Sequence, residues 1–161
     1  MSEVILHLGS NLGYKAINLE LGRALISNHI GDISLSSFVY ETDPWGKKDQ
    51  PSFYNQALKC HTELEPKKVM EAIHFIEKKM GRKKVEHWGS RILDIDIIFY
   101  DEVVMSSEYL TLPHPLLEQR NFVLRPLMDI IPEKRHPVTG APISTLYATC
   151  RDLLRTKRLR E

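Results

Sequence analysis

Two acidic residues stand two positions apart in an otherwise apolar stretch, ILDIDIIFY, that ends at Tyr100. Successive side chains of a β-strand point to opposite faces, so Asp94 and Asp96 would share one face, about 6.7 Å apart at their Cα atoms. Two carboxylates this close repel each other and resist desolvation. A divalent cation would remove that cost, and Mg²⁺ prefers one or two carboxylates together with substrate phosphates. The pair therefore predicts a magnesium site; the alternative is an edge strand whose wet face carries two acids.

A basic loop precedes this strand and would bring cations to the same place. Its basic residues, within GRKKVEHWGSR, are Arg82, Lys83, Lys84, His87 and Arg91. Carboxylates that hold Mg²⁺ and arginines that neutralise phosphate oxygens together suit a metal–polyphosphate complex. Phosphoryl transfer needs mainly positioning and charge stabilisation, without a protein nucleophile. Trp88 and Gly89 would let the loop close over a nucleotide. The alternative is a charged surface loop before an edge strand.

The composition is that of an ordinary globular protein. The chain has 161 residues, 42% hydrophobic and 27% charged, and its net charge of +1 does not by itself favour a polyanionic partner. Its two cysteines lack metal or CxxC spacing, which suits a reducing compartment. We therefore expect a cytoplasmic protein with one catalytic domain at residues 1–150, and a basic, frayed tail at 151–161. We expect neither nucleic acid nor a membrane as a partner.

The order of the expected elements indicates one architecture. Apolar patterning predicts helices at 17–25 and 66–80 and strands at 4–8, 33–42, 53–62 and 93–99. Strand, helix, strand, strand, helix, strand is the split βαβ, or ferredoxin-like, pattern. The expected fold class is therefore α/β (α+β), with an antiparallel sheet and helices packed on one face. Residues 120–130 should help to close the core, and residues 143–149 are a candidate for a short helix.

The odd-numbered residues from Leu93 to Phe99 would form an unbroken apolar face that the helices cover. The face with the carboxylates would then be open, as the floor of a site. Glu77 lies in the last turns of the second helix, which is unfavourable for an acid unless it faces the basic loop; the alternative is a solvated surface residue.

Two loops allow more than one interpretation. The segment GSNLGYK lacks the glycine spacing of a phosphate-binding loop and the Ser or Thr that should follow Lys15, so a strand-to-helix connection is the better interpretation. Trp45 lies in the polar loop DPWGKKDQPS, where it could be a packing anchor or a lid over a ligand.

The stretch HWGSRILDIDII resembles the signature of the 6-hydroxymethyl-7,8-dihydropterin pyrophosphokinases of folate biosynthesis. Further similarity lies in LGSNLG, SSFVYET, FYNQAL, IEKKMGR, LPHP and RNFVLRPL, so it covers about residues 4–147. The resemblance implies a ferredoxin-like monomer that transfers the terminal diphosphate of ATP to the hydroxymethyl oxygen of the reduced pterin and releases AMP.

The resemblance also implies roles for individual residues. Asp94 and Asp96 match the ligands of two Mg²⁺ ions, with Arg82 and Arg91 as further catalytic groups. Asn55 would read the edge of the pterin ring between Phe53 and Phe122. The acceptor would also meet Thr42, Asp43 and Trp45. The groups implied around ATP are Glu77, Lys84, Trp88, Arg91, His114 and Arg120. A flat heterocycle does need aromatic faces and a hydrogen-bonding edge.

Some features depart from the family pattern, and two other function classes match part of the sequence. Lys83 and Lys84 stand where some members carry a second arginine, and lysine lacks its bidentate geometry. A ferredoxin-like RNA-binding module could use the basic loop, although acids on the open face would repel phosphates. A metal-dependent nuclease could use the same acids but would not need Phe53 and Asn55.

Overall fold

The helices and strands follow the expected order, with further elements near the C-terminus. The computed structural model describes residues 1–44, 49–81 and 91–159. The elements are β1 (Ser2–Ser10), α1 (Lys15–His29), β2 (Asp32–Ser36), β3 (Tyr40–Thr42), β4 (Phe53–Thr62), α2 (Pro66–Lys79), β5 (Asp94–Tyr100), β6 (Met105–Ser106), β7 (Thr111–Leu112), a 3-10 turn (Leu117–Gln119), α3 (Asn121–Ile130), α4 (Ile143–Thr149) and β8 (Thr156–Arg158).

One antiparallel sheet carries the fold. Its strand order is β5-β1-β4-β3-β8, and β2 also pairs with β4. The expected strand at 33–42 is two strands, because Ser37 interrupts the ladder: its hydroxyl accepts a hydrogen bond from the backbone N–H of Ala57 (2.9 Å). The central order β5-β1-β4-β2 is that of the split βαβ pattern, so the predicted fold class is confirmed.

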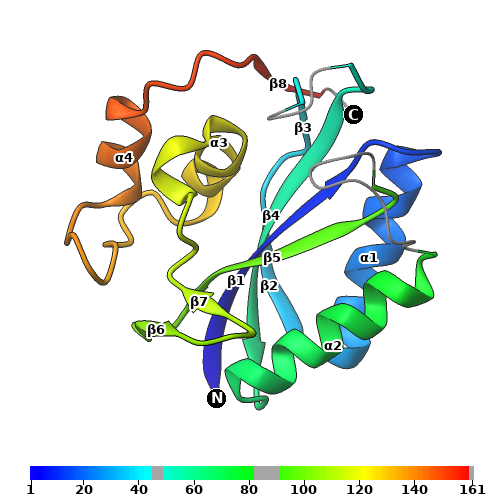
Figure 1. The fold of residues 1–161 in the computed structure, drawn as a ribbon, viewed down its shortest axis with the longest axis horizontal. Coiled ribbons are helices and arrows are strands. Elements are labelled where there is room, and N and C mark those ends of the chain that lie inside the picture. The colour runs from blue at the N-terminus through cyan, green and yellow to red at the C-terminus, as the bar shows by residue number, and fades with distance from the viewer. Residues whose placement is uncertain (45–48, 82–90, 160–161) are drawn as a thin grey trace.

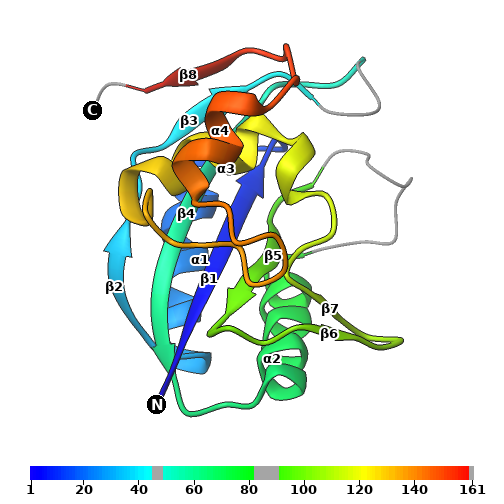
Figure 2. The same ribbon diagram turned by 90° about the vertical axis from the view of Figure 1, so that its left-hand side faces the viewer.

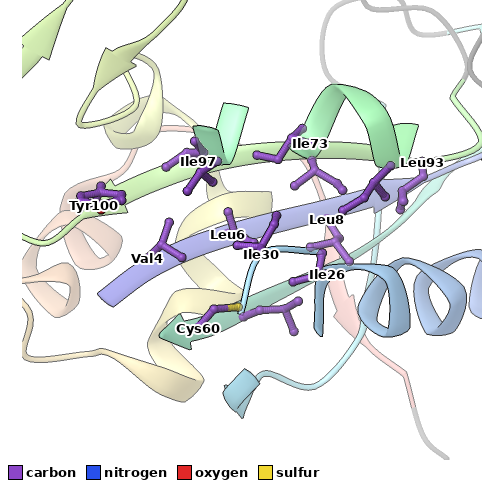
Figure 3. Packing of buried hydrophobic residues seen from close by; sticks show 14 of the residues in the cluster. Val4, Leu6, Leu8, Ile26, Ile30, Cys60, Ile73, Leu93, Ile97 and Tyr100 are labelled. Carbon is purple, nitrogen blue, oxygen red and sulfur yellow. The ribbon is translucent and has the colours of Figure 1, made fainter. Parts of the chain in front are cut away.

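Helices α1 and α2 cover one face of the sheet, as expected (Figure 1). The side chains between them and the strands form one buried cluster, which includes Leu6, Leu8, Ile26, Ile73 and Leu93 (Figure 3). Burial of each Leu or Ile side chain is worth about 1.5–3 kcal/mol. This core fixes which way β1 and β5 face, and hence which of their residues point to the opposite side.

The opposite face is partly covered, which the strand and helix order did not predict. Helices α3 and α4 lie on that side of the sheet (Figures 1 and 2). They bury a second apolar cluster with the sheet, to which Ala57, Phe99, Val123 and Leu124 belong. The expectation that the whole carboxylate face of β5 is open is therefore wrong for its C-terminal half, where apolar residues need a cover.

A bulge in β5 changes the expected pattern of faces. Ile5 of β1 pairs with Phe99. Its neighbour Leu6 pairs with Ile97, which leaves Ile98 as an extra residue on β5. The bulge turns Phe99 to the side of α3, so the prediction that Phe99 continues the odd-numbered apolar face is wrong.

The C-terminal tail is also more ordered than expected. Residues 156–158 form β8, which pairs with β3 at the edge of the sheet. The expectation of a frayed tail is wrong over these residues, because the short strand β3 offers backbone groups on its outer edge that β8 satisfies. The backbone N–H of Leu159 extends this pairing to the carbonyl oxygen of Val39 (2.9 Å).

Candidate active site

A cavity with about 620 Å³ of empty space lies at the uncovered end of the second sheet face. Its lining consists of His7, Gly9, Thr42, Asp43, Phe53, Asn55, Arg91, Asp94, Asp96, Arg120 and Phe122. All of these residues except His7 and Gly9 were predicted as site residues from the sequence. The structure thus brings together carboxylates, arginines, aromatic rings and an amide from segments far apart in the chain. We call this space the first cavity.

The floor of the first cavity is set by strand register. Gly9 of β1 pairs with Asp94 of β5 on one side and with Asn55 of β4 on the other. Two residues away, His7 pairs with Asp96. Paired residues of antiparallel strands point to the same face. The alternation predicted for β5 therefore does put both carboxylates on the cavity side, beside the amide of Asn55.

Gly9 allows Asn55 to lie over the floor. A Cβ atom at position 9 would be 2.8 Å from Asn55 Oδ1 and 3.4 Å from Phe53 Cδ1. Any side chain there would push the amide out of its position. Asn55 in turn is buried and donates a hydrogen bond from Nδ2 to Thr42 Oγ1. The amide is thus held in one orientation, with Oδ1 on the side of Gly9.

Two arginines line the first cavity together with the carboxylates. Burial lowers the pKa of Arg120, and the nearby charges of Asp96, Asp94 and Asp152 oppose this effect. Arg91, at the end of the basic loop, is positioned through its backbone: its N–H donates to Asn11 Oδ1 (2.7 Å). Positive and negative groups together can bind a metal–phosphate complex.

Asn11 is a positioning residue that the sequence did not reveal. Besides accepting from Arg91, it donates hydrogen bonds from Nδ2 to Gln50 Oε1 (2.9 Å) and to the carbonyl oxygen of Pro51 (3.1 Å). The segment GSNLG, interpreted as a turn between strand and helix, therefore also joins two loops that border the site. Its buried polar side chain could not be distinguished from a turn residue without the fold.

Two histidines near the acids are neutral at pH 7. Burial is the main reason that the pKa values of His7 and His114 are lowered to about 4. His114 Nδ1 accepts a hydrogen bond from the backbone N–H of Leu116 (3.2 Å), so its proton lies on Nε2. That nitrogen is 4.0 Å from Asp96 Oδ2. A neutral His114 can donate to a ligand beside Asp96 without adding a charge.

The position of Phe122 depends on a proline inside α3. Pro126 has no N–H, so the carbonyl oxygen of Phe122, four residues earlier, receives no hydrogen bond from it. This oxygen accepts a hydrogen bond from His7 Nε2 instead (2.9 Å). The two rings also meet edge to face, with centroids 5.7 Å apart. His7, which sequence analysis missed, therefore anchors one aromatic wall of the first cavity.

A second cavity, with about 630 Å³ of empty space, lies on the other side of Asp96. It is bounded by β5, α2 and the segment around β6 and β7, and its lining includes Met70, Tyr109, Leu110, Thr111 and His114. Asp96 lines both cavities. Among the described residues that line the second cavity, Asp96 and His114 were predicted as site residues. The apolar and aromatic residues of this lining form no motif in the sequence, because they come from a helix and a hairpin loop that are separate in the chain.

Glu77 supports β5 from its outer edge. Its carboxylate is buried and accepts a hydrogen bond from the backbone N–H of Ile95 (2.8 Å). Ile95 lies between Asp94 and Asp96, so Glu77 holds the strand at the position that separates the two acids. Glu77 does not contribute to the lining of either cavity. Its expected part in nucleotide binding stays a prediction.

Several predicted site residues lie outside the described residues. They are Trp45, Arg82, Lys84 and Trp88, together with Lys83 and His87 of the same basic loop. Their expected contacts with ATP and the acceptor stay predictions.

Comparison with known proteins agrees with the geometry. A family model described as 7,8-dihydro-6-hydroxymethylpterin-pyrophosphokinase (HPPK) matches residues 5–132. The chain belongs to this family. The 2-amino-4-hydroxy-6-hydroxymethyldihydropteridine pyrophosphokinase of Aquifex aeolicus is 37% identical over 143 residues, 89% of each chain. The HPPK resemblance predicted from the sequence motifs is therefore confirmed.

Other HPPK relatives are much longer. The folic acid synthesis protein fol1 of Pneumocystis carinii is 42% identical over 146 residues, which are 89% of this chain but only 20% of that protein. A crystal structure of wild-type Plasmodium falciparum HPPK-DHPS with STZ-DHP matches 91% of this chain and 43% of that one, with a TM-score of 0.75 and 19% identity. At that identity the structure shows a shared fold.

Proposed function

We propose that this chain transfers the terminal diphosphate of ATP to the hydroxymethyl oxygen of 6-hydroxymethyl-7,8-dihydropterin and releases AMP, a step of folate biosynthesis. The observation that carries the proposal is that two cavities of different character meet at Asp96. One has aromatic walls and a fixed amide, and the other has walls of mixed apolar and polar side chains. Asp94, Arg91 and Arg120 line the first cavity together with Asp96. Membership of the HPPK family supports the same reaction.

The acceptor would bind in the first cavity. Its flat ring suits the space beside Phe53 and Phe122, since aromatic faces bury a heterocycle and stack on it. Asn55 would read the ring edge: with Nδ2 held by Thr42, its Oδ1 can accept a hydrogen bond from a ring N–H. Asp43 lies at the rim of the cavity and could accept a further hydrogen bond from the acceptor.

Mg²⁺ would bind at Asp94 and Asp96, and we propose two ions. Among the residues described, no group of three or more His, Cys, Asp or Glu could hold a metal. The remaining ligands would then be phosphate oxygens and water, which is the donor set that Mg²⁺ prefers. Bound there, Mg²⁺ would withdraw charge from the phosphates and polarise the attacking hydroxyl.

ATP would place its base in the second cavity and its phosphates over Asp96. Met70 and Tyr109 offer apolar and aromatic surface for a purine. His114, with its proton on Nε2, would donate to a phosphate oxygen. Arg91 and Arg120 would neutralise the triphosphate from the other side. We expect Arg82, Lys84 and Trp88 to complete the ATP site, and Trp45 to cover the acceptor.

The two sites would bring the reacting atoms together. The hydroxymethyl oxygen would attack the β-phosphorus and release its proton to water, and the bond between that phosphorus and the oxygen bridging to the α-phosphorus would break, so AMP leaves. The arginines offset the charge that moves onto the leaving oxygen. Positioning of this kind requires no protein nucleophile.

We further propose that residues 1–150 act as one catalytic domain, that the protein is a monomer and that it works in the cytoplasm. The acids on the sheet face would repel a nucleic-acid backbone at this site. In the part of the chain that the structure describes, no helix has both the length and the apolar surface needed to cross a membrane.

The proposal is tested by incubation of the protein with Mg²⁺, ATP and 6-hydroxymethyl-7,8-dihydropterin. AMP should form in a 1:1 ratio with the diphosphorylated pterin, and only when the acceptor is present. Formation of ADP and a monophosphorylated pterin would contradict attack at the β-phosphorus. Absence of any product, together with tight RNA binding, would overturn the assignment in favour of a nucleic-acid-binding module.

A further inference from the structure

The C-terminal segment 152–158 contacts two walls of the first cavity. It lies outside the residues that match the HPPK family model. In both ribbon views β8 runs along β3, and the chain before it passes α3 and α4 (Figures 1 and 2). Its contacts with the walls are specific hydrogen bonds and an ion pair, made at Asn121 and Asp43.

The first contact is made by Asp152 at the start of α3. Asn121 donates its backbone N–H to Asp152 Oδ2 (3.0 Å) and its Nδ2 to the carbonyl oxygen of Asp152 (2.9 Å). The first N–H groups of a helix have no partner within the helix, and an acid there is favourable for the helix dipole. Asn121 stands between Arg120 and Phe122, which both line the cavity. Asp152 therefore holds the backbone that carries both side chains.

The carboxylate of Asp152 is itself held in place. Its Oδ1 accepts a hydrogen bond from the backbone N–H of Leu154 (2.9 Å). Its charge also acts on Arg120, whose charged form it favours together with Asp96 and Asp94. Asp152 thus acts electrostatically on a residue that lines the cavity, although Asp152 itself does not line it.

The second contact joins the tail to the wall formed by β3. Thr156 pairs with Thr42, and the backbone N–H of Asp43 donates to the carbonyl oxygen of Arg155 (3.2 Å). The side chain of Arg155 donates to Asp43 Oδ1 (3.2 Å). Thr42 is the residue that accepts from Asn55. The tail therefore supports the strand that orients the amide of the acceptor site.

We propose that segment 152–158 is a positioning element of the acceptor site: it fixes Phe122 through Asn121, and Thr42 and Asp43 through β8. This inference deepens the proposed function and rests on it. Since Asp152 and Arg155 do not line the first cavity, they act through the residues they hold. Removing the contacts of Asp152 and Arg155 should weaken acceptor binding more than ATP binding, because ATP would also be held by Arg91, His114 and the metal site.

Steady-state kinetics of AMP formation by the full chain tests the inference, with each substrate varied while Mg²⁺ and the other substrate are saturating. Asp152→Ala should raise KM for 6-hydroxymethyl-7,8-dihydropterin about five- to tenfold, the effect of losing a charged hydrogen-bond partner. KM for ATP should change less than about threefold. Arg155→Ala, at an exposed position, should raise the acceptor KM about twofold.

Two variants separate positioning from loss of structure. Asp152→Asn keeps an oxygen that can accept from Asn121 and should recover most of the acceptor affinity. Arg151→Ala removes a neighbouring exposed cation and should behave as wild type. An equal rise of both KM values in Asp152→Ala, or an unchanged acceptor KM in both Asp152→Ala and Arg155→Ala, would overturn the inference. If the wild-type chain forms no AMP, the proposed function fails instead, so the two failures are distinguishable.

Discussion

Replacement of Gly9 by alanine should impair acceptor binding while leaving the protein folded. The new Cβ atom would be 2.8 Å from Asn55 Oδ1, several tenths of an ångström closer than ordinary contact, and 3.4 Å from Phe53 Cδ1. Asn55 must therefore shift, and its hydrogen bonds to the acceptor are lost or distorted. Leaving a buried polar group of the ligand unpaired costs about 1–3 kcal/mol, so KM for the pterin should rise about 5- to 150-fold.

The backbone gives no reason for a large loss of stability. Gly9 has no positive φ angle, and alanine in an ordinary conformation restricts the unfolded chain, which offsets part of the crowding. The assay is initial-rate AMP formation with the pterin varied, alongside urea unfolding.

Gly22→Ala is the matched control, since its Cβ atom would meet Leu93 Cδ2 at 2.9 Å on the other face of the sheet. It should leave the acceptor KM within about twofold. An acceptor KM unchanged in Gly9→Ala would refute the argument that Asn55 reads the ring from this floor.

Asp96→Ala should lower kcat by about 100-fold or more, because the metal–phosphate site loses one of its two carboxylates. Asp32→Ala, at an exposed position, should leave kcat unchanged. Near-normal turnover of Asp96→Ala with an intact circular dichroism spectrum would refute the metal-ligand role. Glu77→Ala should lower kcat/KM about tenfold, because β5 loses its support at the position between the two acids. Glu77→Gln should keep most of the wild-type kcat/KM, since an amide oxygen can also accept the hydrogen bond from the backbone N–H of Ile95. Equal losses of kcat/KM in both variants would contradict a positioning role. Burial lowers the pKa of His7 to about 4, so the unfolded chain binds a proton there that the folded chain does not between about pH 6.5 and 4. His7 should therefore lower the free energy of unfolding by up to about 3 kcal/mol as the pH is lowered through this window, in addition to the contribution of His114, whose pKa is also about 4. In urea titrations His7→Gln should remove the share of the fall that His7 contributes and leave that of His114.

The alternation of residues along one strand was enough to predict that Asp94 and Asp96 share a face, because period-2 patterning is local and survives packing. Asn55 was expected in the site only from the family resemblance, and it lies beside the acids because β1 pairs with both β4 and β5. The same rule failed at Phe99, since a bulge depends on how two distant strands pair and leaves no signature in the β5 sequence alone.

The residues that the sequence did not reveal act through tertiary contacts. His7 looks like a polar interruption in an apolar strand, and only the fold shows that Pro126 leaves the Phe122 carbonyl oxygen to it. The second cavity is lined in part by residues of α2 and of a hairpin loop. These residues lie far apart in the sequence, so no regular spacing between them could indicate a shared site. The tail was expected to be frayed, as chain ends usually are, but its backbone pairs with the outer edge of β3.

A structure with both substrate sites filled tests the central claim most directly. The protein would be crystallised with Mg²⁺, a non-hydrolysable α,β-methylene analogue of ATP and 6-hydroxymethyl-7,8-dihydropterin. The account predicts metal at about 2.1 Å from carboxylate oxygens of Asp94 and Asp96, the pterin ring between Phe53 and Phe122, and its hydroxymethyl oxygen facing the β-phosphorus. A metal held elsewhere, or a pterin outside the first cavity, would contradict it.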